Sequence, residues 1–169
     1  NRFWTLDPID GTKGFIRGHQ YAVSLALIEN GDVQIGVLGC PNLTDGWKQD
    51  IGGSGSLIVA QKGKGCWVTN LNSKDAFNQI FVSTLEDTTQ AKLLRSHESG
   101  HTNVSQLDVI ANHMSVNAEP LRLDSQAKYS ILASGKGDLL FRLISDKMPD
   151  YKEKIWDQAA SAIIVEEAG

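Results

Sequence analysis

The sequence predicts an α/β fold, in which an antiparallel sheet region is followed by a smaller region of alternating strands and helices. Long apolar runs flank an Asn-Gly pair in the first half, which is typical of a β-hairpin. The second half carries a helical stripe and a strand–helix–strand alternation, which indicates an α/β layer. A polar stretch at 86–90 divides the halves, so we predict an N-terminal α+β domain over 1–85 and a C-terminal α/β domain over 86–169.

The first half reads as a meander of strands. Residues 1–8 predict a strand that runs into a turn, and the apolar run at 21–28 pairs with the run at 33–40 across a two-residue primed turn. Residues 43–55 are polar and rich in glycine, which predicts a surface loop. Further strands are expected at 56–61, 66–69 and 80–83.

Residues 11–14 can start a helix-like or irregular turn, and the longer helical signals lie in the second half. Apolar residues recur at helical spacing over 104–114. Asp124 and Ser125 can begin a second helix that Gly135 ends, and Trp156-Asp157 precedes a last helix over 158–166. Short strands are expected at 120–123 and 139–143.

Composition excludes several classes of function. The 169 residues carry a net charge of −4, which argues against a nucleic-acid partner or an anionic-membrane binder. No apolar run approaches the roughly 18 residues that a membrane-spanning helix needs. Cys40 and Cys66 lie in separate apolar segments without metal-ligand spacing, which predicts buried free thiols in a reducing, cytoplasmic compartment.

The segment with the clearest chemical content is 4–12. Asp7 ends a strand, Pro8 fixes the backbone angle after it, and Asp10 follows in a tight turn. The two carboxylates can converge, and they then repel each other unless a cation lies between them. Oxygen ligands of this kind favour Mg²⁺, and free N–H groups at 11–14 can hold a phosphate. Asp-Pro and Asp-Gly are also common turn formers, so a purely structural role stays open.

The string FWTLDPIDGTKGFIRG, the following YAVSLALI, and IWDQAA near the far end together resemble the inositol monophosphatase superfamily of Mg²⁺-dependent, lithium-sensitive phosphatases. The resemblance covers essentially the whole chain. Within the superfamily, TLDPIDGTKGFIRG, LDSQAKY and YKEKIWD are similar to the 3′(2′),5′-bisphosphate nucleotidase branch. The resemblance implies a layered α-β-α-β-α sandwich of the type shared with fructose-1,6-bisphosphatases. It also implies removal of the 3′-phosphate from adenosine 3′,5′-bisphosphate, or from 3′-phosphoadenylyl sulfate, by a metal-activated water.

The same resemblance assigns roles by position. Asp7 would bridge two of two or three Mg²⁺ ions, the Ile9 carbonyl would bind the first, and Asp10 and Asp157 would bind the second. Thr12 would orient the attacking water, which makes Asp7, Asp10 and Thr12 the catalytic residues. The residues implied to bind the nucleotide substrate are Gly11, Thr12, His101, Ser125, Lys128, Arg142 and Asp157.

Simpler interpretations of these residues stay open. Ser125 and Asp157 are good helix caps, Arg142 can form a surface ion pair, and His101 can be an ordinary loop histidine. Two other functions also remain: an inositol (poly)phosphate phosphatase of the same superfamily, and a catalytically inactive nucleotide-binding module.

The resemblance places two further acids upstream of DPIDGT, a metal-binding glutamate and a water-activating aspartate. The chain begins six residues before Asp7, so neither acid is in it. We therefore expect the isolated chain to be inactive and unstable, and the full protein to be an active, cytoplasmic monomer. An organelle-targeting segment upstream also stays open.

Overall fold

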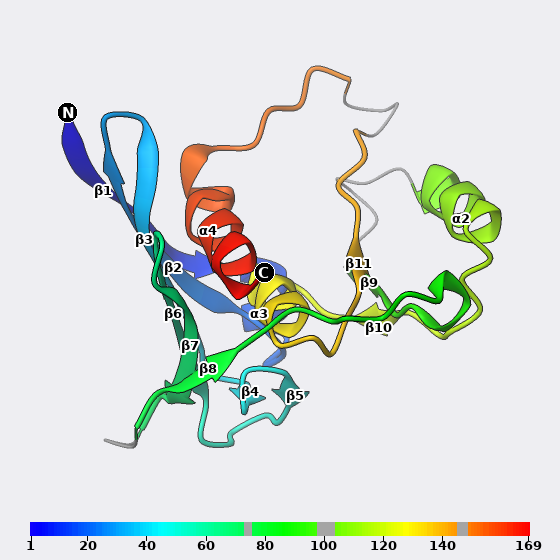
Figure 1. Cartoon of the computed structure of the whole chain (residues 1–169), viewed down its shortest axis with the longest axis horizontal. Coiled ribbons are helices and arrows are strands. Elements are labelled where there is room, and N and C mark those ends of the chain that lie inside the picture. The colour runs from blue at the N-terminus through cyan, green and yellow to red at the C-terminus, as the bar shows by residue number, and fades with distance from the viewer. Residues whose placement is uncertain (73–75, 98–103, 145–148) are drawn as a thin grey trace.

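A large sheet, a small sheet and a two-stranded sheet, with helices between and beside them, make up the described part of the molecule. Figure 1 shows the computed structural model, which describes residues 1–72, 76–97, 104–144 and 149–169. The large sheet has six strands in the order β1-β2-β3-β6-β7-β8, and every neighbouring pair is antiparallel. Its strands are β1 (Arg2–Asp10), β2 (Ala22–Glu29), β3 (Asp32–Cys40), β6 (Ser56–Gln61), β7 (Gly65–Asn70) and β8 (Asn78–Ile80). The meander predicted for the first half is therefore confirmed.

The β2–β3 hairpin has the primed turn that the sequence predicts. Asn30 and Gly31 connect the two strands with φ values of 53° and 94°. Positive φ at both central positions gives the turn the twist of the flanking strands. The hairpin places β2 beside β1, which is the strand that carries the acidic motif.

The small sheet is parallel and is built from very short strands. Its order is β10-β9-β11, with β9 (Leu93–Arg95) in the centre, β10 (Leu121–Arg122) and β11 (Leu139–Leu140). The predicted strand at 139–143 ends early because the partner strand β9 has only three residues. The predicted strand at 80–83 also ends early, since the Val82 N–H bonds to the Ala168 carbonyl (3.1 Å) instead of a strand.

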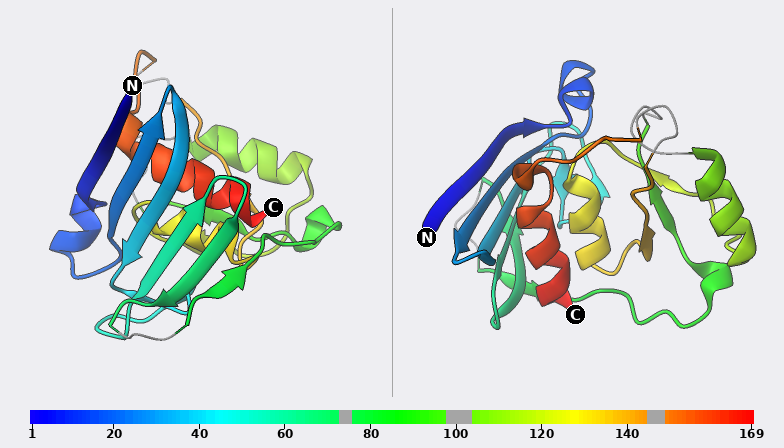
Figure 2. Two further views of the ribbon diagram at one scale, coloured as in Figure 1. Left: turned by 60° about the vertical axis from the view of Figure 1, so that its left-hand side comes forward. Right: turned by 90° about the horizontal axis from the view of Figure 1, so that it is seen from above.

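The helices lie between and beside the sheets. They are α1 (Thr12–Ile16), α2 (Val104–His113), α3 (Ala127–Ala133) and α4 (Ala159–Ala168), with 3₁₀ turns η1 (Thr88–Gln90) and η2 (Ile155–Asp157). Figure 2 shows the layers in the order large sheet, α3 and α4, small sheet, α2. The predicted α/β sandwich is thus confirmed. The predicted loop at 43–55 instead contains the paired strands β4 (Leu43–Thr44) and β5 (Lys48–Gln49).

One face of the large sheet packs against α4, and the core lies there. Leu38 and Ile58 from the sheet are fully buried with Ile164 of α4. The helix comes so close to β3 that a Cβ on Gly36 would lie 2.4 Å from Ile163 and 2.6 Å from the Ala160 carbonyl oxygen. Cys40 and Cys66 are buried free thiols in this core, as predicted. The close contact fixes α4, and with it the segment just before α4, against the large sheet.

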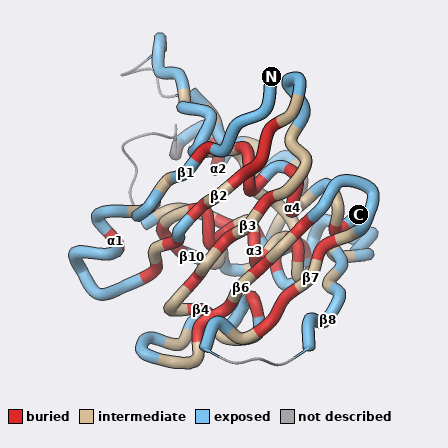
Figure 3. The backbone as a smooth tube through the Cα atoms, turned by 90° about the vertical axis from the view of Figure 1, so that its left-hand side faces the viewer, coloured by how far each residue is buried: buried red, intermediate tan, exposed pale blue. Residues whose placement is uncertain are grey.

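The opposite face of the large sheet is open in the described part of the chain. Figure 3 looks onto this side, and exposed positions follow β1. Trp4 and Leu6 alternate with the buried Thr5 and are 54% and 52% exposed. Apolar side chains left in water this way do not stabilise the fold. They fit the expectation that the isolated chain is unstable, which stays a prediction, as does the domain division at 85/86.

Candidate active site

Three carboxylates from the two ends of the chain meet beside the end of β1. Asp7 and Asp10 lie in the last residues of β1, and Asp157 is the last residue of η2. One carboxylate oxygen from each lies within 4.8 Å of the other two. The convergence of Asp157 with Asp7 and Asp10, on which the enzymatic interpretation depends, is therefore present.

A β-bulge brings Asp7 and Asp10 to the same side. Residues three apart on a regular strand point to opposite faces. Here the pairing shifts between them, because Asp7 lies opposite Ser24 while Asp10 lies opposite Ala22. The extra residue on β1 turns the chain, as bulges do. The Ile9 N–H donates to Asp7 Oδ1 (3.2 Å), which helps to hold this turn.

Asp157 combines two roles. Its Oδ2 accepts a hydrogen bond from the Lys154 N–H (2.6 Å), so the carboxylate does cap its own 3₁₀ turn. The same side chain also offers an oxygen to the acidic cluster. Asp157 therefore caps the 3₁₀ turn and not the last helix, whose N-cap residue is Gln158, and it also belongs to the acidic cluster.

The electrostatics of the pair show that carboxylates are crowded here. Burial raises the pKa of Asp7, the Ile9 N–H opposes this rise, and the charge of Asp157 adds to it. Burial also raises the pKa of Asp10. The Gln126 N–H and Lys128 counteract that rise, whereas the charges of Asp7 and Asp157 reinforce it. Carboxylates in such a group disfavour the charged form unless a cation neutralises them.

The residues fit a hard divalent cation. The three side chains offer only oxygen, which is the donor type that Mg²⁺ takes in proteins. Mg²⁺ keeps several waters and accepts substrate oxygens, so an incomplete protein shell suits it. The pKa values of Asp7 and Asp10 are raised, and a cation bound here would lower them again because its charge favours the ionised carboxylates.

Gly11 lies close to the segment that begins α3, which Asp10 also contacts through the Gln126 N–H. It has a φ of +81°, and a Cβ there would lie 2.6 Å from the Cβ of Ser125. Ser125 itself has a positive φ of 67°. Its Oγ accepts from the Ala127 N–H (3.2 Å), so it shapes the turn into α3, and the residue that caps this helix is Gln126.

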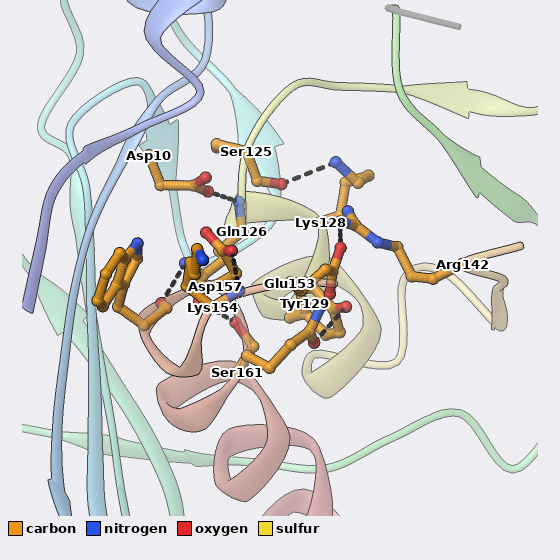
Figure 4. A network of polar contacts seen from close by, with 12 residues as sticks. Asp10, Ser125, Gln126, Lys128, Tyr129, Arg142, Glu153, Lys154, Asp157 and Ser161 are labelled. Atoms are coloured by element: carbon orange, nitrogen blue, oxygen red, sulfur yellow. Dashed lines mark hydrogen bonds and ion pairs between the residues drawn. The ribbon is translucent and has the colours of Figure 1, made fainter. Parts of the chain in front are cut away.

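A pocket of about 300 Å³ opens beside the acidic cluster. It is lined at one end by Asp10 and Asp157 and at the other by Lys128 and Arg142. Figure 4 shows these side chains around one space, with Ser125 between them. The complete lining is Asp10, Gly11, Thr12, Lys13, Gly14, Ser96, Asp124, Ser125, Gln126, Lys128, Tyr129, Arg142, Tyr151 and Asp157. A cavity with carboxylates at one end and cations at the other suits a metal-bound anionic ligand.

The two cations of the pocket are held differently. Lys128 is 2% exposed, and its ammonium donates to the carbonyl oxygens of Ser125 (2.8 Å) and Leu123 (3.4 Å). Burial, and less so the charge of Arg142, lowers its pKa to about 8. Arg142 forms an ion pair with Glu153, so the surface-pair interpretation is also met, although the residue lines the pocket.

The remaining predicted residues are placed unequally. Thr12 lines the pocket, and its hydroxyl donates to the Ile9 carbonyl (3.3 Å), so these two predicted residues are in contact. His101 lies outside the described residues. Sequence reasoning missed three contributors, namely Gln126, Glu153 and the pair of Arg17 with Asp124 (2.5 Å). All four residues lie inside the strings TLDPIDGTKGFIRG, LDSQAKY and YKEKIWD, but a string does not show which partner each side chain meets in the fold.

Fold and site together define an α/β sandwich with a cluster of carboxylates that can bind a cation, beside a pocket that also contains Lys128 and Arg142. The sequence profile described as Inositol monophosphatase family matches residues 1–169, and the chain belongs to this family. The cluster agrees with the metal dependence of the family.

Curated relatives are more specific. A "3'(2'),5'-bisphosphate nucleotidase" of Dictyostelium discoideum is 46% identical and covers 100% of the chain and 49% of its own length. The protein of the same name in Schizosaccharomyces pombe is 43% identical over 99% of the chain and 48% of its own length. The chain thus spans about half the length of the relatives that it matches.

Solved structures agree on the fold. CysQ from Bacteroides thetaiotaomicron, described as a bacterial member of the inositol monophosphatase family, is 22% identical. It superimposes with a TM-score of 0.72 over 99% of this chain and 59% of its own. An inositol monophosphatase from Anabaena gives the same TM-score at 21% identity, with 99% of this chain and 60% of its own covered. Similarity at this level of identity shows the fold alone.

Proposed function

We propose that this chain carries part of the active site of an Mg²⁺-dependent 3′(2′),5′-bisphosphate nucleotidase. The observation that carries the proposal is the pocket that the carboxylates of Asp10 and Asp157 line together with the cations of Lys128 and Arg142. The names of the most similar curated relatives support the same activity. The substrates would be adenosine 3′,5′-bisphosphate and 3′-phosphoadenylyl sulfate, which give AMP or adenylyl sulfate and phosphate.

The acidic cluster would hold two or three Mg²⁺ ions through Asp7, Asp10, Asp157 and the Ile9 carbonyl. Bound there, the ions would supply a nucleophilic water of lowered pKa and neutralise the phosphate charge. The Thr12 hydroxyl donates a hydrogen bond to the Ile9 carbonyl. The hydroxyl oxygen of Thr12 can therefore accept a hydrogen bond from the attacking water. That bond would orient the water toward phosphorus.

The cationic end would bind the nucleotide. Lys128 and Arg142 supply charged donors for the phosphate that is not cleaved. Gly11 brings its backbone close to Ser125, so both line the same wall of the pocket. This wall would separate the nucleoside from the scissile phosphate.

Phosphate release from the full natural protein in Mg²⁺ tests the proposal. We expect the kcat/KM for adenosine 3′,5′-bisphosphate to be at least about tenfold higher than that for inositol 1-phosphate. The reason is that Lys128 and Arg142 can bind a second phosphate, which inositol 1-phosphate does not have. Preference for inositol 1-phosphate would favour the inositol phosphatase alternative. Nucleotide binding without turnover would favour the inactive module. Residues 1–169 alone should show no turnover, because the resemblance places two required acids upstream.

We further propose that the protein acts as a cytoplasmic monomer on a small phosphorylated nucleotide, with no nucleic-acid or membrane partner. Among the described residues, no helix combines the length and apolarity needed to cross a bilayer. The division into domains at 85/86 is likewise a proposal. The large sheet ends at Ile80 and the small sheet begins at Leu93, which supports the division, whereas the packing of α4 on the large sheet joins the two parts in one core.

A further inference from the structure

Gln126 touches all the segments that build the acidic cluster. It is 4% exposed and precedes the first residue of α3. Its backbone N–H donates to Asp10 Oδ2. Its side-chain Nε2 donates to the carbonyl of Trp156 (3.1 Å), the residue directly before Asp157. One residue therefore contacts Asp10 itself and the backbone next to Asp157.

The same side chain also reaches the strand beside Asp7. Its Oε1 accepts from the hydroxyl of Ser24 (3.0 Å), and Ser24 is the cross-strand partner of Asp7. The hydroxyl of Ser161, in the first turn of α4, donates to the same oxygen. Both lone pairs of the amide oxygen are thus used.

The orientation of this amide is determined by its neighbours. The Trp156 carbonyl can only accept, so the NH₂ group of Gln126 must face it. The oxygen must then face the two serine hydroxyls, which can both donate. A buried amide with its oxygen saturated and its donor directed at a single carbonyl has one low-energy arrangement.

We propose that Gln126 is a positioning residue that sets the separation of Asp10 and Asp157. The inference rests on the proposed function, in which these two carboxylates bind the same ion. Gln126 binds neither the ion nor the substrate through its side chain. It fixes the Asp10 carboxylate through its N–H and the η2 turn through its amide, so that the two ligands stay at a distance that a cation can bridge.

Metal binding by the full natural protein tests this. Mn²⁺ serves as the probe, with its Kd and stoichiometry measured by calorimetry and the melting temperature of the metal-free protein measured alongside. Gln126→Leu keeps the N–H to Asp10 but removes the bonds to Trp156, Ser24 and Ser161. We expect the Mn²⁺ Kd to rise by at least about tenfold, the range found for residues that orient metal ligands.

Ser130→Ala is the matched control. Ser130 is fully buried in the same helix, but its hydroxyl donates to the Gly46 carbonyl, away from the acidic cluster. We expect this variant to lower the melting temperature and leave the Mn²⁺ Kd unchanged. A Kd for Gln126→Leu within about twofold of the wild type would overturn the inference, because Gln126 would then have a structural role only.

Ser161→Ala keeps the test decisive if Gln126→Leu does not fold. This change removes one of the two hydroxyls that saturate the amide oxygen, and we expect a Kd raised about two- to threefold. An unchanged Kd would overturn the inference. A wild-type protein that binds no Mn²⁺ would instead overturn the proposed function, so the two failures are distinguishable.

Discussion

The two ends of the pocket differ in how completely the protein itself compensates their charge. At the acidic end, Asp7, Asp10 and Asp157 crowd together, and burial raises the pKa of Asp7 and Asp10. At the cationic end, Arg142 is paired with Glu153 and Lys128 donates to two backbone carbonyls. The described residues therefore compensate the acidic end only in part, through Lys128 and the Gln126 N–H at Asp10, whereas both cations of the other end already have partners.

This difference predicts which features of the proposed site metal binding and nucleotide binding depend on. A cation relieves repulsion at the acidic end without displacing any protein contact. A phosphate at the cationic end must share Arg142 with Glu153, whose charge partly neutralises the guanidinium and so weakens its attraction for the phosphate. We expect metal binding to be sensitive to geometry and nucleotide binding to be sensitive to Glu153.

The largest effect is expected where the two ends meet, at Gly11. In Gly11→Ala the new methyl would lie 2.6 Å from Ser125, at a φ of +81° that costs an alanine about 1–2 kcal/mol. Displacement of the acidic turn should lower kcat/KM for the bisphosphate by about a hundredfold. Phosphate-release kinetics on the full natural protein measure this.

Gly18→Ala is the matched control for that change. Gly18 has a similar φ of +69°, but a Cβ there meets nothing within 4 Å. An alanine at position 18 has a similar conformational cost from the positive φ, but its methyl group makes no close contact. Equal activity losses in Gly11→Ala and Gly18→Ala would show that the approach to Ser125 is unimportant.

The next effect separates Arg142 from its internal partner. Arg142→Met should raise KM for adenosine 3′,5′-bisphosphate by about tenfold with a smaller change in kcat, since a charge-assisted bond to phosphate is lost. Glu153→Gln should do the reverse and lower KM, because it frees the guanidinium. Steady-state kinetics on both variants check the pair. A KM raised in both would mean that Glu153 orients Arg142 and does not compete with the substrate.

Part of this arrangement follows from sequence and part does not. The β2–β3 hairpin depends on adjacent residues, so its turn and its strands are predictable. The central strand β9 was missed. Leu93 and Leu94 are both 1% exposed, and so short an apolar run has no alternation to mark it as a strand.

The site shows the same division. Asp7 and Asp10 stand out as a motif, and the sequence predicts that they converge, but through a tight turn after a strand that ends at Asp7. In the structure β1 continues to Asp10 and a bulge brings the two carboxylates together. Pro8 is the local signal, because a proline inside a strand marks an edge or a bulge. Gln126 is less visible still. Its four contacts come from β1, β2, the segment before α4 and α4 itself, so its role exists only after the chain has folded.

A smaller effect concerns pH at the cationic end. Burial lowers the pKa of Lys128 to about 8, so its charge is lost as the pH rises through that value. The Kd for AMP should therefore rise severalfold between pH 7 and pH 9, the interval on either side of that pKa. Calorimetric titration of the full natural protein in Mg²⁺ measures this. In Lys128→Met the same interval should show a flatter profile, and an equally steep one would exclude Lys128 as the titrating group.

The smallest effect is expected at the two buried thiols, of which Cys40 lies near the acidic end. Burial raises the pKa of Cys40 and Cys66 to about 12, with the charge of Asp10 adding to the rise for Cys40. At pH 8 the thiolate is then about one part in ten thousand of each residue. A disulfide reagent at pH 8 should leave both thiols unmodified, and should titrate both in guanidinium chloride. Fast reaction of Cys40 alone would mean that the strand end beside Asp10 opens to water, and the acidic end would then be less firmly held than its contacts indicate.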